Sequence, residues 1–217
     1  MSIDYCPPPD QGLALVHHDE AMVVVDKPAG LLSVPGRGEG KHDCMAARVQ
    51  AAFPDALIVH RLDMGTSGLL VLARGAEMHR LLSIAFLQRR VEKRYVAIVA
   101  GHMTQDEGEI DLPMITDWPN RPRQKVDHDI GKPSQTRYRV LSRDDDSTRV
   151  ELEPLTGRSH QLRVHLQQIG HPILGDELYA SPADASRSPR LLLHAEYLSF
   201  NHPVSGATMH FHCPAPF

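Results

Sequence analysis

Short runs of apolar and β-branched residues, separated by turn-forming residues, recur along most of the chain. The first run, at residues 21–26 (AMVVVD), ends at the turn sequence KPAG. Runs of this length that end in Pro, Gly or Asp predict strands followed by turns. On this pattern we expect strands at residues 21–26, 69–73, 94–99, 135–141, 148–152, 191–193 and 208–212.

Helical spacing of apolar residues occurs in three segments. Within residues 77–90, apolar side chains recur at positions i, i+3, i+4, i+7 and i+8, which predicts a helix that buries one face. These side chains are Met78, Leu81, Leu82, Ala85 and Phe86. A second helix is expected over residues 44–53. A third is expected after Gly157, with Ser159 as its N-cap and Gly170 at its C-terminal end.

Together these elements predict a mixed α/β chain of the α+β class, with a mostly antiparallel mixed sheet flanked by helices. There is no internal repeat and no obvious linker, so we expect residues 1–217 to form a single domain. A long Pro-rich connection spans residues 113–133. Long connections in compact domains are often functional, which makes this one a candidate binding segment.

The composition is 41% hydrophobic and 23% charged, which excludes a disordered or collagen-like chain. The uncharged stretch at residues 64–73 is about half of the roughly 20 residues that a membrane span needs, so no membrane partner is expected. The first residues, MSIDYCPPPDQG, lack the features of a signal peptide. Cys6, Cys44 and Cys213 are too far apart for a CxxC motif or a disulfide framework. We therefore expect a cytoplasmic protein.

The net charge of −4 argues against a nucleic-acid partner, but the charge is unevenly distributed. Residues 119–143 hold seven basic side chains and two acidic ones, a net charge of +5, and the other residues carry −9. A second basic cluster surrounds Glu92. Either cluster could be a solvated face, or a surface that follows phosphates on an otherwise acidic protein.

A carboxylate lies in an unusual setting at His60-Arg61-Leu62-Asp63-Met64-Gly65-Thr66-Ser67-Gly68. Asp63 follows Arg61 by two residues, so near a strand end both side chains can lie on the same side. A guanidinium there would hold the carboxylate in its charged form. Asp63 is then either a turn former or a nucleophile that attacks an electrophilic sugar carbon.

The fourteen histidines are potential metal ligands. His210, His212 and Cys213 are the best candidates, because positions i and i+2 of a strand share a face and Zn²⁺ accepts N and S ligands. No further spaced ligands complete the set. We therefore favour surface histidines on a terminal strand, and expect no metal.

The run HRLDMGTSGLLVLAR at residues 60–74 resembles the signature motif of the RluA-type pseudouridine synthases, which isomerise uridine in RNA to its C-glycoside. Blocks that resemble the same family follow its order along nearly the whole chain. They are VVVDKPAGLLSVPG, EKRYVAIVAG, GRSHQLRVHLQQIGHPILGD and RLLLHAEYLSFNHP. The resemblance implies the family's catalytic fold with a cleft between two lobes, and it implies no cofactor.

The resemblance also assigns roles to four residues. Asp63 matches the catalytic nucleophile, and Tyr95 matches the aromatic residue that stacks on the target base and helps to remove its C5 proton. Arg163 matches the basic residue that pairs with the catalytic carboxylate. Arg61 matches the residue that enters the RNA stack when the uridine leaves it. Alternatively, Tyr95 is a buried strand aromatic and Arg163 a solvent-facing helix residue.

RNA is the partner that this resemblance implies. We expect basic residues of the 119–143 segment and of the start of the third helix to contact it. The expected RNA-binding residues, besides Arg61, are Arg121, Arg123, Lys125, Lys132, Arg158 and His160.

Finer matching narrows the expected substrates. The stretches DLPMITDWPNRPRQKV and GKPSQTRY resemble a dual-specificity member of the family, which acts on a 23S rRNA hairpin and on the anticodon stem-loop of certain tRNAs. We expect no N-terminal RNA-binding domain of the S4 type, and a monomer. The alternatives are an RNA-binding or chaperone module without turnover, and a metal hydrolase that uses His210, His212 and a carboxylate.

Overall fold

The computed structural model describes residues 5–217, and these residues divide into two compact units. The first unit contains the described residues up to Glu92 together with Ala195–Pro216. The second contains Lys93–His194 and the terminal Phe217. Residues 1–4, which belong to the segment expected to lack a signal peptide, lie outside the described residues.

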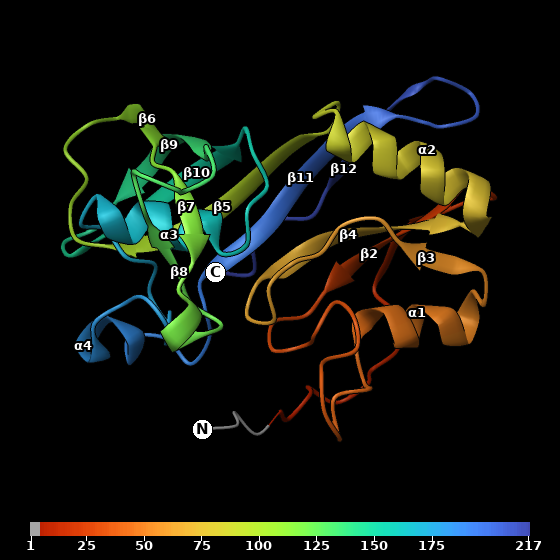
Figure 1. Cartoon of the computed structure of the whole chain (residues 1–217), viewed down its shortest axis with the longest axis horizontal. Helices are drawn as coiled ribbons and strands as arrows, with labels where there is room; N and C mark the ends of the chain where they lie inside the picture. Colours follow the sequence, from red (N-terminus) through yellow and green to blue (C-terminus); the bar gives the residue numbers. More distant parts are fainter. Residues whose placement is uncertain (1–4) are drawn as a thin grey trace. The chain divides into compact units, whose positions relative to one another are not determined.

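The first unit is built on a sheet in which the pairs β1–β2, β2–β4, β3–β4 and β11–β12 are antiparallel (Figure 1). Its strand order is β1-β2-β4-β11, with β3 paired to β4 and β12 paired to β11. The register sets Asp26 opposite Leu69 and Lys27 opposite Gly68. The strands are β1 (Leu15–His18), β2 (Met22–Lys27), β3 (Ala56–Ile58), β4 (Ser67–Arg74), β11 (Leu193–Asn201) and β12 (Thr208–His212).

Two helices, α1 (Met45–Ala52) and α2 (Gly75–Leu87), accompany this sheet. Strands β2 and β4 are buried along almost their whole length, which explains why their sequences are continuous apolar runs. Leu82 is buried in the core with Val71 and Phe211, and the expected stripe residues Met78, Ala85 and Phe86 pack against it, whereas Leu81 is half-buried and is not part of this core. The amphipathic pattern therefore predicted the buried face of α2 correctly.

The second unit contains the strand order β5-β10-β9-β6, again with antiparallel neighbours. Helix α3 packs against β10, and Leu162 and Leu166 enter a core with Val150 and Leu152. The elements are β5 (Glu92–Ala100), β6 (Glu107–Asp111), β9 (Gln135–Arg143), β10 (Ser147–Pro154), α3 (Gln161–Gln168) and α4 (Pro182–Ala185).

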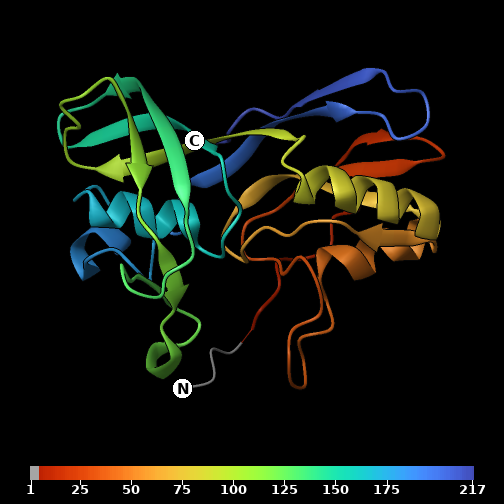
Figure 2. The ribbon, with the colours of Figure 1, turned by 45° about the horizontal axis from the view of Figure 1, so that its top comes forward.

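The Pro-rich connection at residues 113–133 is an ordered hairpin. It contains β7 (Met114–Thr116), the 3-10 turn η1 (Trp118–Asn120) and β8 (Gln124–Val126). Strands β7 and β8 pair with each other in a separate two-stranded sheet. Figure 2 shows this hairpin, in green, extending from its own unit to a tip at η1. The sequence indicated the segment but not its strands, because each strand has only three residues.

Two of the expected boundaries are wrong. Ser159 is not the N-cap of α3. His160 takes that place in a left-handed conformation, with φ of 55°, and makes no side-chain cap bond. The buried amide of Gln161 accepts from the Arg158 N–H instead, at 3.0 Å. The strand expected at residues 191–193 shares only Leu193 with β11, which continues through several polar residues to Asn201.

The helix expected at residues 77–90 begins two residues earlier and ends at Leu87. The α+β class and the mostly antiparallel sheet are confirmed. Within residues 5–217, no helix has both the length and the apolar character that crossing a membrane requires.

A glycine substitution tests the packing beside the signature motif. Gly68 has φ of 109°, and an added Cβ would overlap the backbone of Ala195. Gly206 has φ of 72° but open space around it. We expect Gly206→Ala to lower the free energy of unfolding by about 1–2 kcal/mol, the penalty for a left-handed alanine, and Gly68→Ala to lower it by about 3 kcal/mol or more. Equilibrium urea unfolding measures both, and equal losses would contradict the overlap.

Candidate functional site

Asp63 lies in a turn between β3 and β4. The Thr66 N–H donates to the carbonyl of Asp63 at 3.1 Å, which closes the turn. Leu62 is buried, whereas Arg61 is exposed and Asp63 is half-buried. The turn thus anchors itself through Leu62 and leaves the two charged side chains on either side of it more accessible.

The turn is fixed through its backbone by the segment that follows β2. Ser33 Oγ accepts from the Leu62 N–H at 3.0 Å and donates to the Leu62 carbonyl at 2.7 Å. The Gly30 N–H donates to the Met64 carbonyl at 2.8 Å. Because the residues on both sides of Asp63 are held, its backbone has little freedom to move.

Lys27 extends this network with a buried charge. Its side chain is 0% exposed, and its ammonium donates to the carbonyls of Pro28, Leu31 and Met64 at 2.9, 2.7 and 3.2 Å. A buried ammonium is tolerated only where acceptors surround it. Lys27 was not among the predicted site residues, although a lysine that follows the apolar run at the start of β2 was a signal for such a role.

His60 holds the start of the motif. Its Nε2 accepts from the Val71 N–H at 3.0 Å, and its ring stacks on Phe86 with centroids 4.4 Å apart. Strand β4 and helix α2 therefore hold the first residue of the HRLD motif, and the segment after β2 holds its third residue, Leu62.

In the second unit, Arg163 is held by a carboxylate. Arg163 is 7% exposed, and its Nε and Nη2 donate to the two oxygens of Asp176 at 2.8 and 2.7 Å. Asp176 is 1% exposed and also accepts from the N–H groups of Leu178 and Tyr179. Arg163 is thus a buried, charge-paired residue, and the alternative of a solvent-facing helix residue is wrong.

The Arg163–Asp176 pair restricts how Arg163 can bind a second carboxylate. A guanidinium presents its donors along fixed edges, and Asp176 occupies the Nε–Nη2 edge. Asp176 leaves the two N–H groups of Nη1 and the second N–H of Nη2 for other acceptors. Asp176 was missed as a site residue, although it is the last residue of the block GRSHQLRVHLQQIGHPILGD.

Tyr95 lies on β5, where it is half-buried and paired in register with Leu152 of β10. It packs against the hydrophobic core of the second unit. Its backbone is therefore fixed by the sheet, as a residue that offers a ring to a ligand would require.

Tyr179 connects the hairpin to α3. Its hydroxyl accepts from the Gln124 N–H at 2.8 Å and lies 2.7 Å from His160 Nδ1. Arg163 lies over its ring at 5.1 Å and Arg123 at 5.8 Å. His160, expected to contact RNA, is therefore half-buried with one ring nitrogen at the Tyr179 hydroxyl.

The basic segment at residues 119–143 separates into two parts. On β9, Arg137, Arg139 and Arg143 pair with Glu109, Glu151 and Asp106 at 3.2, 3.0 and 2.7 Å. These arginines are largely neutralised, so the excess of positive charge lies elsewhere.

The rest of the basic segment is exposed. Within residues 5–217, no acidic group lies within ion-pair distance of Arg121, Arg123, Lys132 or Arg158, whereas Lys125 pairs with Asp127 at 3.3 Å. Arg158 donates to the carbonyl of Pro133 at 3.4 Å, and Pro133 is the residue that follows Lys132. The charge available to an anion therefore gathers on the hairpin and at the start of α3.

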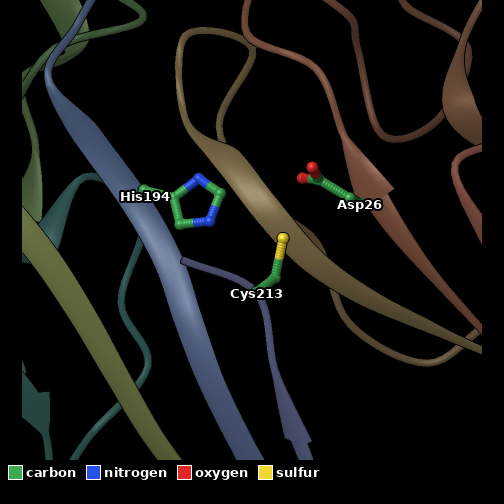
Figure 3. Close-up of side chains that lie close together, drawn as sticks. All are labelled: Asp26, His194 and Cys213. Atoms are coloured by element: carbon green, nitrogen blue, oxygen red, sulfur yellow. The ribbon is translucent and has the colours of Figure 1, made fainter. Parts of the chain in front are cut away.

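The potential metal ligands do not group as the sequence suggested. His210 is 2.8 Å from the Tyr197 hydroxyl, and His212 is 3.9 Å from Glu196. Cys213 instead lies near Asp26 and His194, with ligand atoms within 4.8 Å of one another (Figure 3). His194 is on β11, one residue before that strand enters the first unit.

Without a bound metal, the Cys213 thiol of this group is held in its protonated form. Burial, followed by the negative charge of Asp26 and a hydrogen bond to it, raises the pKa of the Cys213 thiol from 9.0 to about 12. Only a thiolate is a good zinc ligand. A protonated thiol that donates to Asp26 is the arrangement that these contacts favour.

Comparison with known proteins adds an independent observation. A model of the family described as RNA pseudouridylate synthase matches residues 21–168. The chain is 54% identical over 206 residues to a Yersinia pestis protein, and 52% identical over 215 residues to one from Escherichia coli (strain K12). Both are named Dual-specificity RNA pseudouridine synthase RluA. The alignments cover 94% and 99% of this chain, and 100% and 98% of the relatives.

Solved structures give the same result. Human RNA Pseudouridylate Synthase Domain Containing 1 superposes with a TM-score of 0.82 at 29% identity, covering 97% of this chain and 86% of that one. Human RNA Pseudouridylate Synthase Domain Containing 4 superposes with a TM-score of 0.75 at 27% identity, covering 94% and 88%.

The Cys213 thiol provides a test of the metal alternative. Alkylation proceeds through the thiolate, so a pKa of about 12 in place of 9.0 should slow the reaction of Cys213 roughly 10³-fold at pH 8. Cys6 is exposed and serves as the internal reference. We expect mass spectrometry after timed iodoacetamide treatment to show Cys6 modified and Cys213 intact, with or without added Zn²⁺. Rapid labelling of Cys213 that Zn²⁺ suppresses would favour a metal site.

Proposed function

The chain belongs to the RNA pseudouridylate synthase family, and we propose that its substrates are uridines in two RNAs, a hairpin of 23S rRNA and the anticodon stem-loop of certain tRNAs. Membership makes the protein an isomerase that acts on RNA. The choice of RNAs rests on one observation, the 52–54% identity over nearly the whole chain to relatives named dual-specificity enzymes.

The reaction rearranges one nucleotide without redox change. The bond from uracil N1 to ribose C1′ breaks, the base rotates, and a bond forms from C5 to C1′. The C5 proton is lost and N1 gains one, so no cofactor or water is consumed. A uridine inside a folded RNA must first leave its stack, at a cost of a few kcal/mol that contacts in the pocket offset.

We assign Asp63 as the catalytic carboxylate, which acts on the ribose of the target uridine either as a nucleophile at C1′ or as a base at C2′. The support is the way its turn is built, since Ser33 and Gly30 hold the backbone on either side. The Lys27 ammonium, bound to the Met64 carbonyl, supplies a fixed positive charge next to the carboxylate-bearing residue. A preorganised carboxylate has less freedom to lose when it reacts.

Arg163, Tyr95 and Arg61 take supporting roles in this proposal. The family resemblance gives Arg163 the role of the basic residue that pairs with the catalytic carboxylate, and Asp176 fixes its guanidinium. Tyr95 offers its ring to the extruded uracil. Arg61, exposed beside the anchored Leu62, fills the vacancy in the RNA stack and recovers part of the lost stacking energy.

A second candidate function is an RNA-binding module that has the fold but no turnover. It predicts tight binding of the same stem-loops without any pseudouridine. The two functions differ in one measurable product, so a single assay separates them.

The test uses both RNAs, each labelled with tritium at uridine C5. We expect the wild-type protein to release tritium from both, and Asp63→Asn to abolish release from both while its affinity for RNA changes less than about threefold, since the substitution keeps the shape of the side chain. Asp145→Asn, in the turn before β10, is the matched control and should retain full activity.

Each outcome of this assay has a distinct meaning. Release from only one RNA would overturn the dual substrate but not the enzyme. Turnover by Asp63→Asn would remove Asp63 from the role of catalytic carboxylate. Binding by the wild type without any release would favour the non-catalytic module.

Basic residues with and without an acidic partner should contribute differently to RNA binding. Replacing Lys132 and Arg158 by Gln should weaken RNA binding and lower the slope of log affinity against log salt by about 1 for each lost phosphate contact. Replacing Arg137 and Arg139 by Gln removes the same formal charge from residues already paired with acids, and should leave the slope nearly unchanged. Equal slopes for the two double variants, measured by fluorescence anisotropy between 50 and 200 mM salt, would contradict the assignment.

A further inference from the structure

Trp118 is a large aromatic side chain presented to solvent. It is the only tryptophan of the chain, and 66% of it is exposed. Among the large hydrophobic residues exposed within residues 5–217, it is the one aromatic. The reaction proposed above gives it no role, and neither the core of the second unit nor α3 uses it.

The backbone beneath Trp118 is ordered by a dense set of hydrogen bonds. The Asp117 N–H donates to the Arg123 carbonyl, and the Arg123 N–H to the Asn120 carbonyl, both at 3.0 Å. Asn120 bonds Asp117 twice, from its N–H at 3.0 Å and from its side-chain amide at 2.9 Å. The exposed ring is therefore carried on a rigid tip, so ordering it on binding has a low entropic cost.

The base of the hairpin is tied to the Arg163 network. The Gln124 N–H donates to the Tyr179 hydroxyl at 2.8 Å, and Arg123 donates to the Leu178 carbonyl. Leu178 and Tyr179 in turn donate their N–H groups to Asp176, which holds Arg163. The position of the tip is thus fixed relative to a residue that we place in the catalytic machinery.

The chemistry around the ring suits a nucleotide. The Arg121 guanidinium lies over the Trp118 ring, 4.5 Å from its centroid, within the range of a cation–π contact. The exposure of 66% is measured with Arg121 in place, so most of the ring surface stays open to a second partner. An aromatic surface beside a cation without an acidic partner can stack a base and pair the adjoining phosphate.

We propose that Trp118 and Arg121 form a stacking site for an unpaired RNA base other than the target uridine. The proposal rests on RNA being the substrate. In the interior of a duplex both faces of a base are covered by its neighbours, so the site favours stem-loops with an accessible loop or flanking nucleotide over fully paired RNA. Trp118 acts in substrate binding and takes no part in the isomerisation.

Because Trp118 is the only tryptophan of the chain, tryptophan fluorescence reports on this site alone. In a protein carrying Asp63→Asn, which holds the substrate unconverted, we expect a stem-loop to quench Trp118 fluorescence, and a blunt duplex of the same stem to bind with much less quenching. Trp118→Ala should raise Kd and KM for the stem-loop about tenfold, at the low end of what one stacked base contributes, and leave kcat unchanged. Trp118→Phe, which keeps an aromatic face, should restore most of the affinity.

Controls separate stacking from folding and from the proposed function. Ile130→Ala shortens another exposed side chain in the same connection, 70% exposed, and should leave Kd unchanged. All variants should unfold at the wild-type urea concentration. No quenching by stem-loop RNA, or an unchanged Kd in Trp118→Ala, would overturn the stacking site even if tritium release is normal. Equal quenching by duplex and stem-loop would also overturn it. Absence of tritium release from the wild type would instead count against the proposed function.

Discussion

The position of Asp63 depends on how buried carbonyl groups are satisfied. The turn between β3 and β4 and the segment after β2 contain little regular structure, so their backbone groups find few partners in a sheet or helix. The ammonium of Lys27 and the hydroxyl of Ser33 replace those partners and join the two segments. Because an unpaired buried carbonyl is costly, each bond that satisfies one also fixes the residue that we propose as the catalytic carboxylate. Stability and catalytic geometry are here one requirement.

The second unit handles its charge by the same principle. A buried arginine needs a paired carboxylate, and Asp176 fills that need for Arg163 while it also accepts two backbone N–H groups. On the surface, the arginines of β9 are balanced by Glu109 of β6, Glu151 of β10 and Asp106, which precedes β6, whereas those of the hairpin are not. Net charge over a sequence window cannot express this difference, because cross-strand pairing depends on register.

Much of the chain was predictable where a local rule applied. The continuous apolar runs gave β2 and β4, and the helical stripe gave the buried face of α2. The signature run gave Asp63 as a candidate. The prediction of Ser159 as N-cap was wrong because the bond at this boundary goes from the Arg158 N–H to the side chain of Gln161. The strand expected at residues 191–193 was too short because tertiary burial extends β11 through polar residues. Lys27 was missed because the bond that joins it to the Asp63 turn goes to the Met64 carbonyl, 37 residues away. Asp176 was missed because its partner Arg163 lies 13 residues earlier, on a helix.

The first unit is formed by two separate parts of the chain, the described residues up to Glu92 and Ala195–Pro216, and the second part brings in β11. The sheet of the first unit needs β4, made early, and β11 and β12, made last, whereas Lys93–His194 form an uninterrupted segment. During synthesis on the ribosome, the second unit can therefore close upon itself while the edge of β4 still awaits its neighbour. The strands that carry the signature motif reach their final pairing only when the last residues emerge. An aborted or shortened chain would then leave β4 without its β11 neighbour.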